Sequence, residues 1–491
     1  MQIFHHWSWL PVSCSILAGV LVLVEPAHAR QTTVTGGAST SYDFRSRSYQ
    51  QEVSGTNSDE GDAKKLGIGP EVSVVSQGIY DVFSLRYAPT LYYDYISEDT
   101  GVNHQLNFKE DRQLSRFWSL TLSDDFTRSD DPSVSYSSAQ TSSSSNSAVP
   151  GQTQTTSADQ LSRDLSGQTY WTNTATVQTA YTLSAASRIG GGYSYSVLRN
   201  DDGSGGYTSQ QDADDYNDYD KHTFFTNYTH GFNQNWRSSL GLNYTRGLYD
   251  NDPSTTGIGT PDLDQYGGDL GIDYIQDPST FYPLKYSSSE TQYDGDTRPG
   301  FQVHNGSAGW DHTFDPRNRL ALGAGPSYAK TDGLDGTWGY NAYMNYTRQY
   351  EHASFALLLS KQFEAQNFTG SQDSGLTDTY SARATFRYQY TEHLALDLFG
   401  GYSWQSTYDP QGDYLTAAEG ETPDPGDTTG DLSYDKDIYE AGAGCSYSFA
   451  QWYQAGVRYV YYVSDGHLGS DQYTDHQVLF TLSAKKELWR W

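Results

Sequence analysis

The stretch FNQNWRSSLGLNYTRGLYD, residues 232–250, decides which fold class the chain belongs to. Large apolar residues alternate one by one with small or polar residues in it. Leu240 and Leu242 fall on one side of an extended chain, and Gly241 and Asn243 fall on the other. A period of two residues is the pattern of a β-strand with one apolar and one polar face. The fold therefore depends on what covers such apolar faces.

The same alternation recurs along most of the chain. Clear examples are residues 66–74, 83–88, 118–123, 188–197, 320–325, 340–346, 380–388 and 456–463. In a soluble sandwich the bulky faces of two sheets must pack on each other, which is difficult for so many long strands. In an outer-membrane barrel the bulky residues face lipid and the small or polar residues face the lumen. The pattern favours the barrel.

Composition supports this choice and excludes other classes. Hydrophobic residues make up 36% of the 491 residues, with 42 Tyr and 47 Gly but only 2 Met, so the apolar material is aromatic rather than aliphatic. Tyrosine is enriched where a barrel meets the membrane interface, because its ring is apolar and its hydroxyl needs water. A net charge of -30 argues against a nucleic-acid partner, since binding phosphates needs a basic surface.

The first 29 residues have the features of a secretory signal peptide. Residues 16–24 form an apolar run, and Ala27 and Ala29 make a small-x-small cleavage site before Arg30. Cys14 lacks the preceding residues of a lipid-attachment site, so we expect no lipid there. After Arg30 no stretch approaches the roughly 20 apolar residues of a membrane helix. We predict a signal peptide over residues 1–29 and one barrel domain over residues 30–491.

The connections between strand candidates alternate between short and long. The short gaps are residues 76–81, 112–115, 183–187, 232–235, 276–280, 315–318, 350–352, 391–393 and 449–452. The long gaps are residues 54–65, 129–166, 201–220, 249–263 and 408–431. We therefore predict an all-β, transmembrane, antiparallel up-and-down barrel of about 20 strands (18–22), with short periplasmic turns and long extracellular loops.

A recurring motif at the short gaps points to a family. It consists of an aromatic residue, a turn, then Trp or Arg leading an apolar alternation. Its copies are FNQNWRSSLGLNY, FDPRNRLALGAGPSY, YTEHLALDLFGGYSW and FAQWYQAGVRYVYY. With RFWSLTLSDDFTRSDDP (116–132) and the terminal Trp491, the chain resembles Gram-negative outer-membrane β-barrels, in particular porin-like proteins associated with exopolysaccharide export.

The resemblance implies a place in the cell outer membrane and a set of partners. They are outer-membrane lipid and lipopolysaccharide, the barrel-assembly machinery, and exopolysaccharide-export components. One feature departs from the pattern, because Phe480 and Leu482 have the opposite parity to Trp489 and Trp491. Either a bulge near residues 485–486 changes the register, or the last residues form a tail.

Other motifs have a structural explanation. NYT at Asn227, Asn243 and Asn345 matches a glycosylation acceptor but lies inside strand patterns. The acidic run over residues 212–218 lacks calcium-loop spacing, which favours a solvated loop, with bridging of surface sugars by divalent cations as the alternative. The histidines are scattered and form no recognisable catalytic or metal-binding set. We predict no enzyme activity, no cofactor and no metal site.

The candidate functional residues are the charged members of the polar faces, which we expect to line the lumen. They are Glu71, Arg86, Asp269, Asp273, Arg383, Arg387, Asp397, Glu440 and Arg458. As a wetted wall they need no function, and as a channel lining they would set ion selectivity. The Ser-rich tract over residues 129–166 is long enough to fold into the pore, although its composition equally fits a disordered surface loop.

The sequence thus predicts a porin-like outer-membrane channel for a polar solute or an exported polysaccharide, open and weakly cation-selective. The main alternative is an outer-membrane anchor, assembly or binding protein for surface polysaccharide or a secreted partner, with no transport role. An enzyme acting on envelope lipid or sugar is a further alternative. A sheath for electron carriers would need a separate haem protein, because the chain has no C-x-x-C-H motif.

The signal-peptide assignment predicts the mass of the mature protein. Cleavage after Ala29 should give a chain that begins at Arg30, with no lipid on Cys14. Intact-mass analysis of protein extracted from membranes measures this directly. A mature chain that keeps Met1, or one that begins at Cys14, would contradict it.

Overall fold

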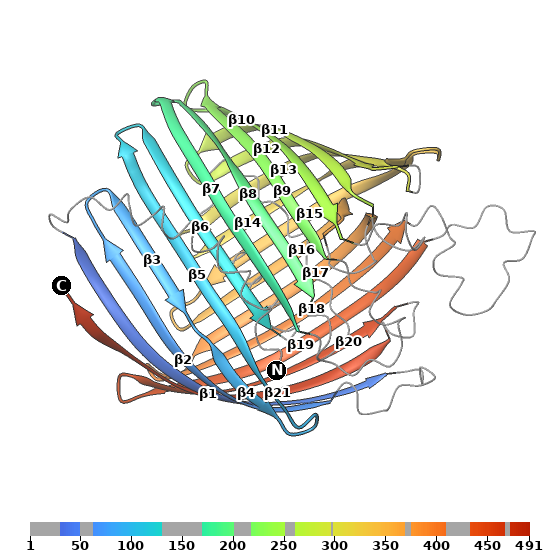
Figure 1. The fold of residues 1–491 in the computed structure, drawn as a ribbon. Helices are drawn as coiled ribbons and strands as arrows, with labels where there is room; N and C mark the ends of the chain where they lie inside the picture. The colour runs from blue at the N-terminus through green and yellow to red at the C-terminus, as the bar shows by residue number, and fades with distance from the viewer. Residues whose placement is uncertain are drawn as a thin grey trace, which may run out of the picture.

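The computed structural model describes residues 30–49, 62–129, 169–200, 218–250, 261–295, 298–368, 375–408, 433–466 and 472–491. All regular structure in these ranges is β-strand, and the strands form one closed sheet (Figure 1). The described part of the chain contains no helix that could cross a membrane.

Each strand is long and pairs with its neighbours in the chain. The strands are β1 (Gln31–Tyr49), β2 (Ala63–Gln77), β3 (Asp81–Tyr87), β4 (Thr90–Asp94), β5 (Asp99–Ser115), β6 (Trp118–Ser129), β7 (Tyr170–Ser184), β8 (Ser187–Asn200), β9 (Tyr219–Gly231), β10 (Trp236–Tyr249), β11 (Leu263–Asp277), β12 (Thr280–Tyr293), β13 (Phe301–Asp315), β14 (Asn318–Thr331), β15 (Thr337–Gln349), β16 (Ala353–Gln366), β17 (Gly375–Gln389), β18 (Leu394–Tyr408), β19 (Ser433–Phe449), β20 (Tyr453–Asp465) and β21 (Tyr473–Arg490).

Two of the 21 segments share one position in the wall. Both β3 and β4 lie between β2 and β5, because residues 88–89 interrupt a single crossing of the barrel. Pro89 has no N–H to donate to the ladder, which explains the break. The wall therefore has 20 spanning strands, and the predicted antiparallel barrel of about 20 strands is confirmed. Residues 32–51 and 280–294, which alternate poorly, supply most of β1 and β12.

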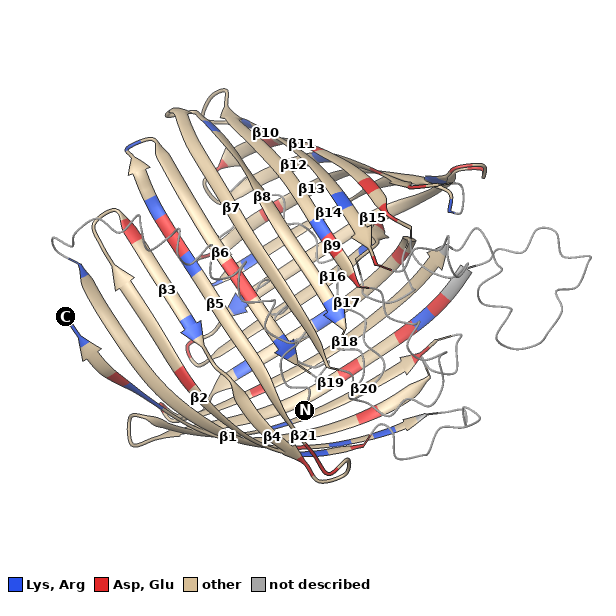
Figure 2. Cartoon of the chain, viewed as in Figure 1, with Lys and Arg blue, Asp and Glu red and all other residues tan. Residues whose placement is uncertain are grey.

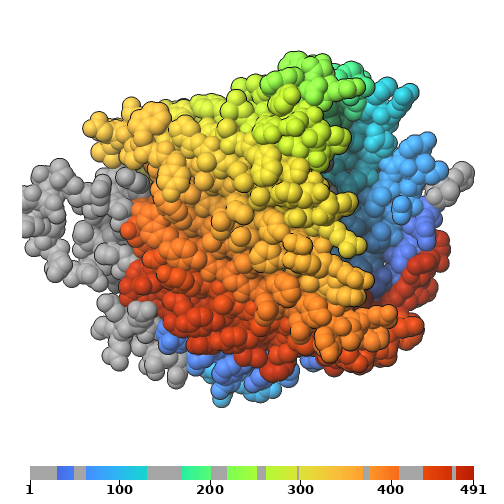
Figure 3. Space-filling view, turned by 180° about the vertical axis from the view of Figure 1, so that it is seen from behind, coloured from blue at the N-terminus to red at the C-terminus, as the bar shows by residue number. Residues whose placement is uncertain are grey.

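The wall closes where β1 pairs with β21 in antiparallel register from Thr33↔Arg490 to Tyr49↔Tyr473. Figure 3 shows these first and last strands, blue and red, side by side. At the base of the seam Thr32 and Trp491 exchange backbone hydrogen bonds of 2.8 and 3.0 Å. Closure leaves no sheet edge, which a β-structure in lipid requires.

Local hydrogen bonds explain why the short turns form where they do. The backbone N–H of Arg317 donates to Asp315 Oδ1 at 2.7 Å, and that of Asn235 donates to Asn233 Oδ1 at 2.8 Å. Such Asx turns let a side chain replace a backbone partner in a tight reversal. Eight of the nine predicted short gaps coincide with turns, but the one at residues 112–115 is wrong. A register shift after Gln113 extends β5, and its turn is residues 116–117.

The outer connections are more varied than the prediction of long loops suggests. Residues 95–98, 294–300 and 332–336 are short connections on that side. The predicted loops at 54–65, 129–166, 201–220, 249–263 and 408–431 lie mostly outside the described residues.

The change of parity near the end of β21 is produced by a bulge. Val34 faces Trp489 and Thr35 faces Glu487, so Leu488 is the extra residue. The bulge lies two residues beyond the predicted position, and the alternative of an unpaired tail is wrong. It returns Trp489 and Trp491 to the face that carries Leu482, where both are about two-thirds exposed, at 63% and 67%.

This geometry predicts that Leu488 can be deleted. Removing one extra residue gives a regular strand in which Trp489 and Trp491 still face outward, so the folded yield should stay close to wild type. Deleting residues 487–488 together should turn both tryptophans towards the lumen and lower the folded yield severely. The shift in gel mobility between unheated and heated samples measures folded barrel. Equal loss in both variants would contradict the position of the bulge.

Candidate functional site: the barrel lumen

Large side chains on the lumen face of the barrel lie flat along the wall. At many inward positions a glycine stands beside a large side chain of the neighbouring strand. A Cβ at Gly401 would lie 2.6 Å from Glu440 Oε1, and one at Gly309 would lie 2.6 Å from Tyr343 Oη. Glycine leaves room for these side chains to lie flat on the wall rather than project across the lumen.

Five of the nine predicted lumen residues come together on β17–β20. Arg383 and Glu440 form an ion pair that spans the strand between them, above Gly401. Arg387 and Asp397 are opposite each other in the register of β17 and β18. Arg458 completes the group on β20.

An aromatic ring holds this group together. The guanidinium carbons of Arg458 and Arg383 lie 4.9 and 5.5 Å from the centre of the Phe399 ring. The ring in turn rests on Gly442. Three guanidinium groups and two carboxylates leave one net positive charge at mid-height of the wall, which we call the arginine cluster (residues 383, 387, 397, 399, 440 and 458). The stacked guanidiniums gain cation–π attraction without leaving the wall.

The other four predicted residues form two smaller sets elsewhere on the wall. Glu71 pairs with Arg86 at 3.2 Å and with Lys485 of the closing strand at 2.6 Å. Asp273 pairs with Arg237 at 2.6 Å. Asp269 precedes Asp273 on the same face of β11 and lies against Gly241. Figure 2 shows the charges of the barrel as paired blue and red bands on neighbouring strands.

Sequence reasoning missed several partners on the same face. Lys485 and Arg237 neutralise predicted carboxylates, and Arg319 makes a two-pronged contact with Asp311 at 2.6 and 3.0 Å. Arg237 follows Trp236 by one position, so its opposite parity was the available signal.

Side chains occupy part of the extracellular end of the lumen. Residues of β7–β17, with Phe368 after β16, form a buried apolar cluster, which contains Tyr170, Leu198, Tyr219, Tyr249, Leu263, Tyr293, Phe301, Val303, Ala329, Phe363, Phe368 and Leu376. Pairing of β15 with β16 stops at Ala342↔Lys361, whereas β16 stays paired with β17 up to Gln366. The β16–β17 hairpin thus separates from the wall at its outer end and packs inside.

Two residues after β16 connect this hairpin to β9, β10 and β12. Asn367 accepts hydrogen bonds from Tyr249 Oη on its backbone oxygen at 2.5 Å and from Tyr293 Oη on Oδ1 at 2.8 Å. Phe368 is 1% exposed, and its ring lies edge-on to the Tyr219 ring at 5.3 Å between centres and stacks on the Tyr249 ring at 6.0 Å. We call residues 367–368 the latch. The Ser-rich tract predicted as a constriction lies almost wholly outside the described residues.

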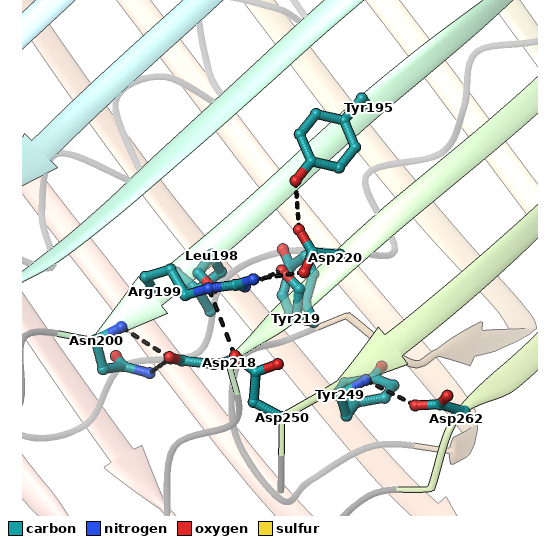
Figure 4. Close-up of polar contacts among 10 residues, drawn as sticks. All are labelled: Tyr195, Leu198, Arg199, Asn200, Asp218, Tyr219, Asp220, Tyr249, Asp250 and Asp262. Carbon is teal, nitrogen blue, oxygen red and sulfur yellow. Dashed lines mark hydrogen bonds and ion pairs between the residues drawn. The ribbon is translucent and has the colours of Figure 1, made fainter. Parts of the chain in front are cut away.

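At the extracellular ends of the strands, carboxylates accept hydrogen bonds from backbone N–H groups, as Figure 4 shows for β8–β11. The backbone N–H of Asn200 donates to Asp218 Oδ1 at 2.8 Å, and that of Tyr249 donates to Asp262 Oδ1 at 2.8 Å. Arg199 pairs with Asp220 above them. Of the predicted acidic run, Asp218 is described and has this structural role. The described residues contain no group of three potential ligands for a metal ion.

The same rim continues to β12. Arg246 lies 2.6 Å from Asp294 and 3.1 Å from Asp264. Its hydrogen bond holds the pKa of Asp294, which lies just beyond the strand, below the usual value.

Comparison with known proteins finds no family model and no curated protein that matches the chain. Among solved structures it is similar to OpdQ of Pseudomonas aeruginosa (12% identity, 93% of this chain, 98% of that chain, TM-score 0.39). It is also similar to the siderophore receptor PirA of Pseudomonas aeruginosa (9%, 94% and 81%, 0.45) and to OccAB3 of Acinetobacter baumannii (8%, 93% and 99%, 0.39). At such scores the function must be argued from the lumen itself.

The number of strands, the closure of the sheet and the apolar outward face define the class of membrane protein. Outward side chains such as Leu242 and Leu284 are more than half exposed, as only a lipid-facing surface tolerates around a whole barrel. The chain is an outer-membrane β-barrel.

The Arg383–Glu440 pair predicts a non-additive pair of substitutions. Arg383→Met leaves Glu440 without its ion-pair partner and should lower the free energy of unfolding by about 1–3 kcal/mol. Adding Glu440→Leu removes the stranded charge, so the double variant should recover much of the loss. Urea unfolding in lipid vesicles measures both. Simple addition of the two single effects would contradict a direct pair.

Proposed function

We propose that this protein is a channel that passes polar solutes through the lumen of the barrel. The arrangement of side chains on the lumen wall, on the periplasmic side of the latch, supports this proposal. Its charged side chains pair along the wall, and glycines such as Gly401 and Gly309 give large neighbours room to lie flat. A wall that only had to be filled would use bulky inward side chains that meet across the centre.

Weak cation preference follows from the same pairing. Of the four arginines predicted to line the wall, Arg86 and Arg383 have carboxylate partners, which reduces their effect on a passing ion. The acidic composition of the chain then dominates at the mouth, where carboxylates concentrate cations. The arginine cluster, with one net positive charge, opposes this preference at mid-height and keeps it small.

The latch makes the extracellular end the narrow part of this path. The buried cluster and residues 367–368 occupy lumen space between β9 and β16. Small polar solutes are the cargo that best fits a path narrowed in this way. An exported polysaccharide, the other cargo that the sequence suggests, would need the latch displaced.

The latch also gives the main alternative its support. If residues 367–368 and the buried cluster seal the barrel permanently, the protein is an outer-membrane anchor that holds a surface polysaccharide or a secreted partner. The two proposals differ in one measurable quantity, which is ion flow through the folded barrel.

Single-channel recording in planar bilayers decides between them. The wild-type barrel should conduct, and Phe368→Ala should increase the conductance, because the substitution removes the ring that packs against Tyr219 and Tyr249. Phe314→Ala is the matched control, since Phe314 is an exposed aromatic residue on the lipid side. It should leave conductance unchanged.

Asymmetric KCl tests the selectivity in the same experiment. A small reversal potential of the cation-selective sign is expected. Strong anion selectivity would show that the arginine cluster governs the pore. No conductance from wild type or from Phe368→Ala, with both folded, would favour the anchor.

A further inference from the structure

The wall is split between β15 and β16 at its extracellular end. The two strands pair from Gln349↔Ser354 up to Ala342↔Lys361 and no further. Residues 337–341 of β15 still pair with β14, but on the side of β16 they have no ladder partner within the described ranges. An edge of this kind is costly next to a bilayer, so we looked for the segment that completes it.

The part of β16 that has left the wall is in register with this edge. Continuing the observed pairing residue by residue puts Asn341 opposite Gln362 and Thr337 opposite Gln366. Thr337 is the first residue of β15, and Gln366 is the last residue of β16. Residues 337–341 and 362–366 therefore match over their whole length, with no residue left over on either strand.

The sequence of residues 362–366 also suits a place in the wall. Phe363 has the outward parity of Leu359, whereas Gln362 and Glu364 have the lumen parity. On β17 the apolar Leu376 continues the outward face. Apolar residues would thus meet lipid and polar residues would meet the lumen, as on the other strands.

In the structure the same apolar residues pack on the inside of the wall instead. Phe363 is 5% exposed, and a Cβ on Gly339 of β15 would lie 2.6 Å from its ring. Asn305 of β13 donates a hydrogen bond of 3.3 Å to the backbone oxygen of Phe363. Glycine at residue 339 makes room for the ring, because a larger side chain there would collide with it. The chain therefore has features that fit two positions of the hairpin.

Lys361 marks the point where β15 and β16 part. Its ammonium pairs with Asp378 at 2.8 Å and lies 4.8 and 5.4 Å from the centres of the Tyr340 and Tyr380 rings. Asp378 is on β17, which is paired with β16 along its length. This ion pair is thus compatible with either position of the hairpin relative to β15, as a hinge requires.

We propose that the β16–β17 hairpin is a gate with two positions, a proposal that rests on the channel function proposed above. In the closed position, which the structure shows, residues 367–368 hold the hairpin inside the lumen. In the open position residues 362–366 pair with residues 337–341, the wall becomes continuous and the latch leaves the lumen. Each position has its own gain: the closed one buries Phe363 and Phe368, and the open one completes a ladder of backbone hydrogen bonds.

A disulfide across the split tests the open position. In a Cys445→Ser background, Thr337→Cys with Gln366→Cys joins residues that are opposite each other only when the gate is open, at a Cα separation of about 4.5–5.5 Å that a disulfide can span. Mild oxidation of the folded protein in membranes should form this bond. The oxidised barrel should conduct about two-fold or more better than wild type, because a lumen of this circumference regains the space of the latch. A reducing agent should restore the wild-type conductance.

Two further pairs complete the design. Asn345→Cys with Leu358→Cys joins inward residues that are opposite each other below the split, so its disulfide should form and leave the conductance unchanged. Thr291→Cys with Asn367→Cys replaces side chains whose Oγ1 and Nδ2 atoms are 3.3 Å apart in the closed position. Its disulfide should lower the conductance until it is reduced.

Bond formation is measured by thiol labelling after denaturation, which does not depend on any current. The proposal is overturned if the Asn345→Cys and Leu358→Cys pair forms its disulfide but the Thr337→Cys and Gln366→Cys pair does not. It is also overturned if the second bond forms in a conducting barrel without raising its conductance. If that bond forms but no folded barrel conducts, the two positions of the hairpin are supported and the channel function is contradicted.

Discussion

The hydrogen-bonded seam between β1 and β21 is the constraint on which the rest of the structure depends. In a bilayer no water can satisfy a free strand edge, so the first and last strands must pair along their length. The antiparallel register of this pair goes with an even number of crossings and brings Lys485 beside Glu71. It also explains why the extra residue Leu488 is tolerated, since the bulge keeps the seam paired while Trp489 and Trp491 return to the lipid side.

Closure makes the inside of the barrel a separate chemical environment. Its side chains are arranged differently below the latch and at the outer end. Below the latch, ion pairs such as Arg383–Glu440 lie over glycines, so charge stays on the wall and space stays open. Near the outer end the β16–β17 hairpin leaves β15, and Phe368 packs against Tyr219 of β9 and Tyr249 of β10. A channel and its narrowest part thus come from one sheet, without a separate domain in the described residues.

The lipid-facing side of the barrel is apolar, in contrast to the polar lumen. Leu, Val and aromatic side chains cover most of it, because hydrocarbon offers no partner to a polar group. Some charged residues also have the outward parity, among them Asp124 of β6, which is 3% exposed because its own neighbours cover it.

The sequence by itself determined the barrel, its strand number to within two, and eight of nine short turns, because a period of two residues and Asx turns are local properties. It also predicted one face for the nine charged candidates. Only the tertiary structure decided which of them meet, since Arg383 and Glu440 are far apart in the chain and are joined by the register of three strands. The latch was likewise invisible, because Asn367 finds Tyr249 and Tyr293 across a closed lumen, and no sequence pattern records contacts made across a cavity.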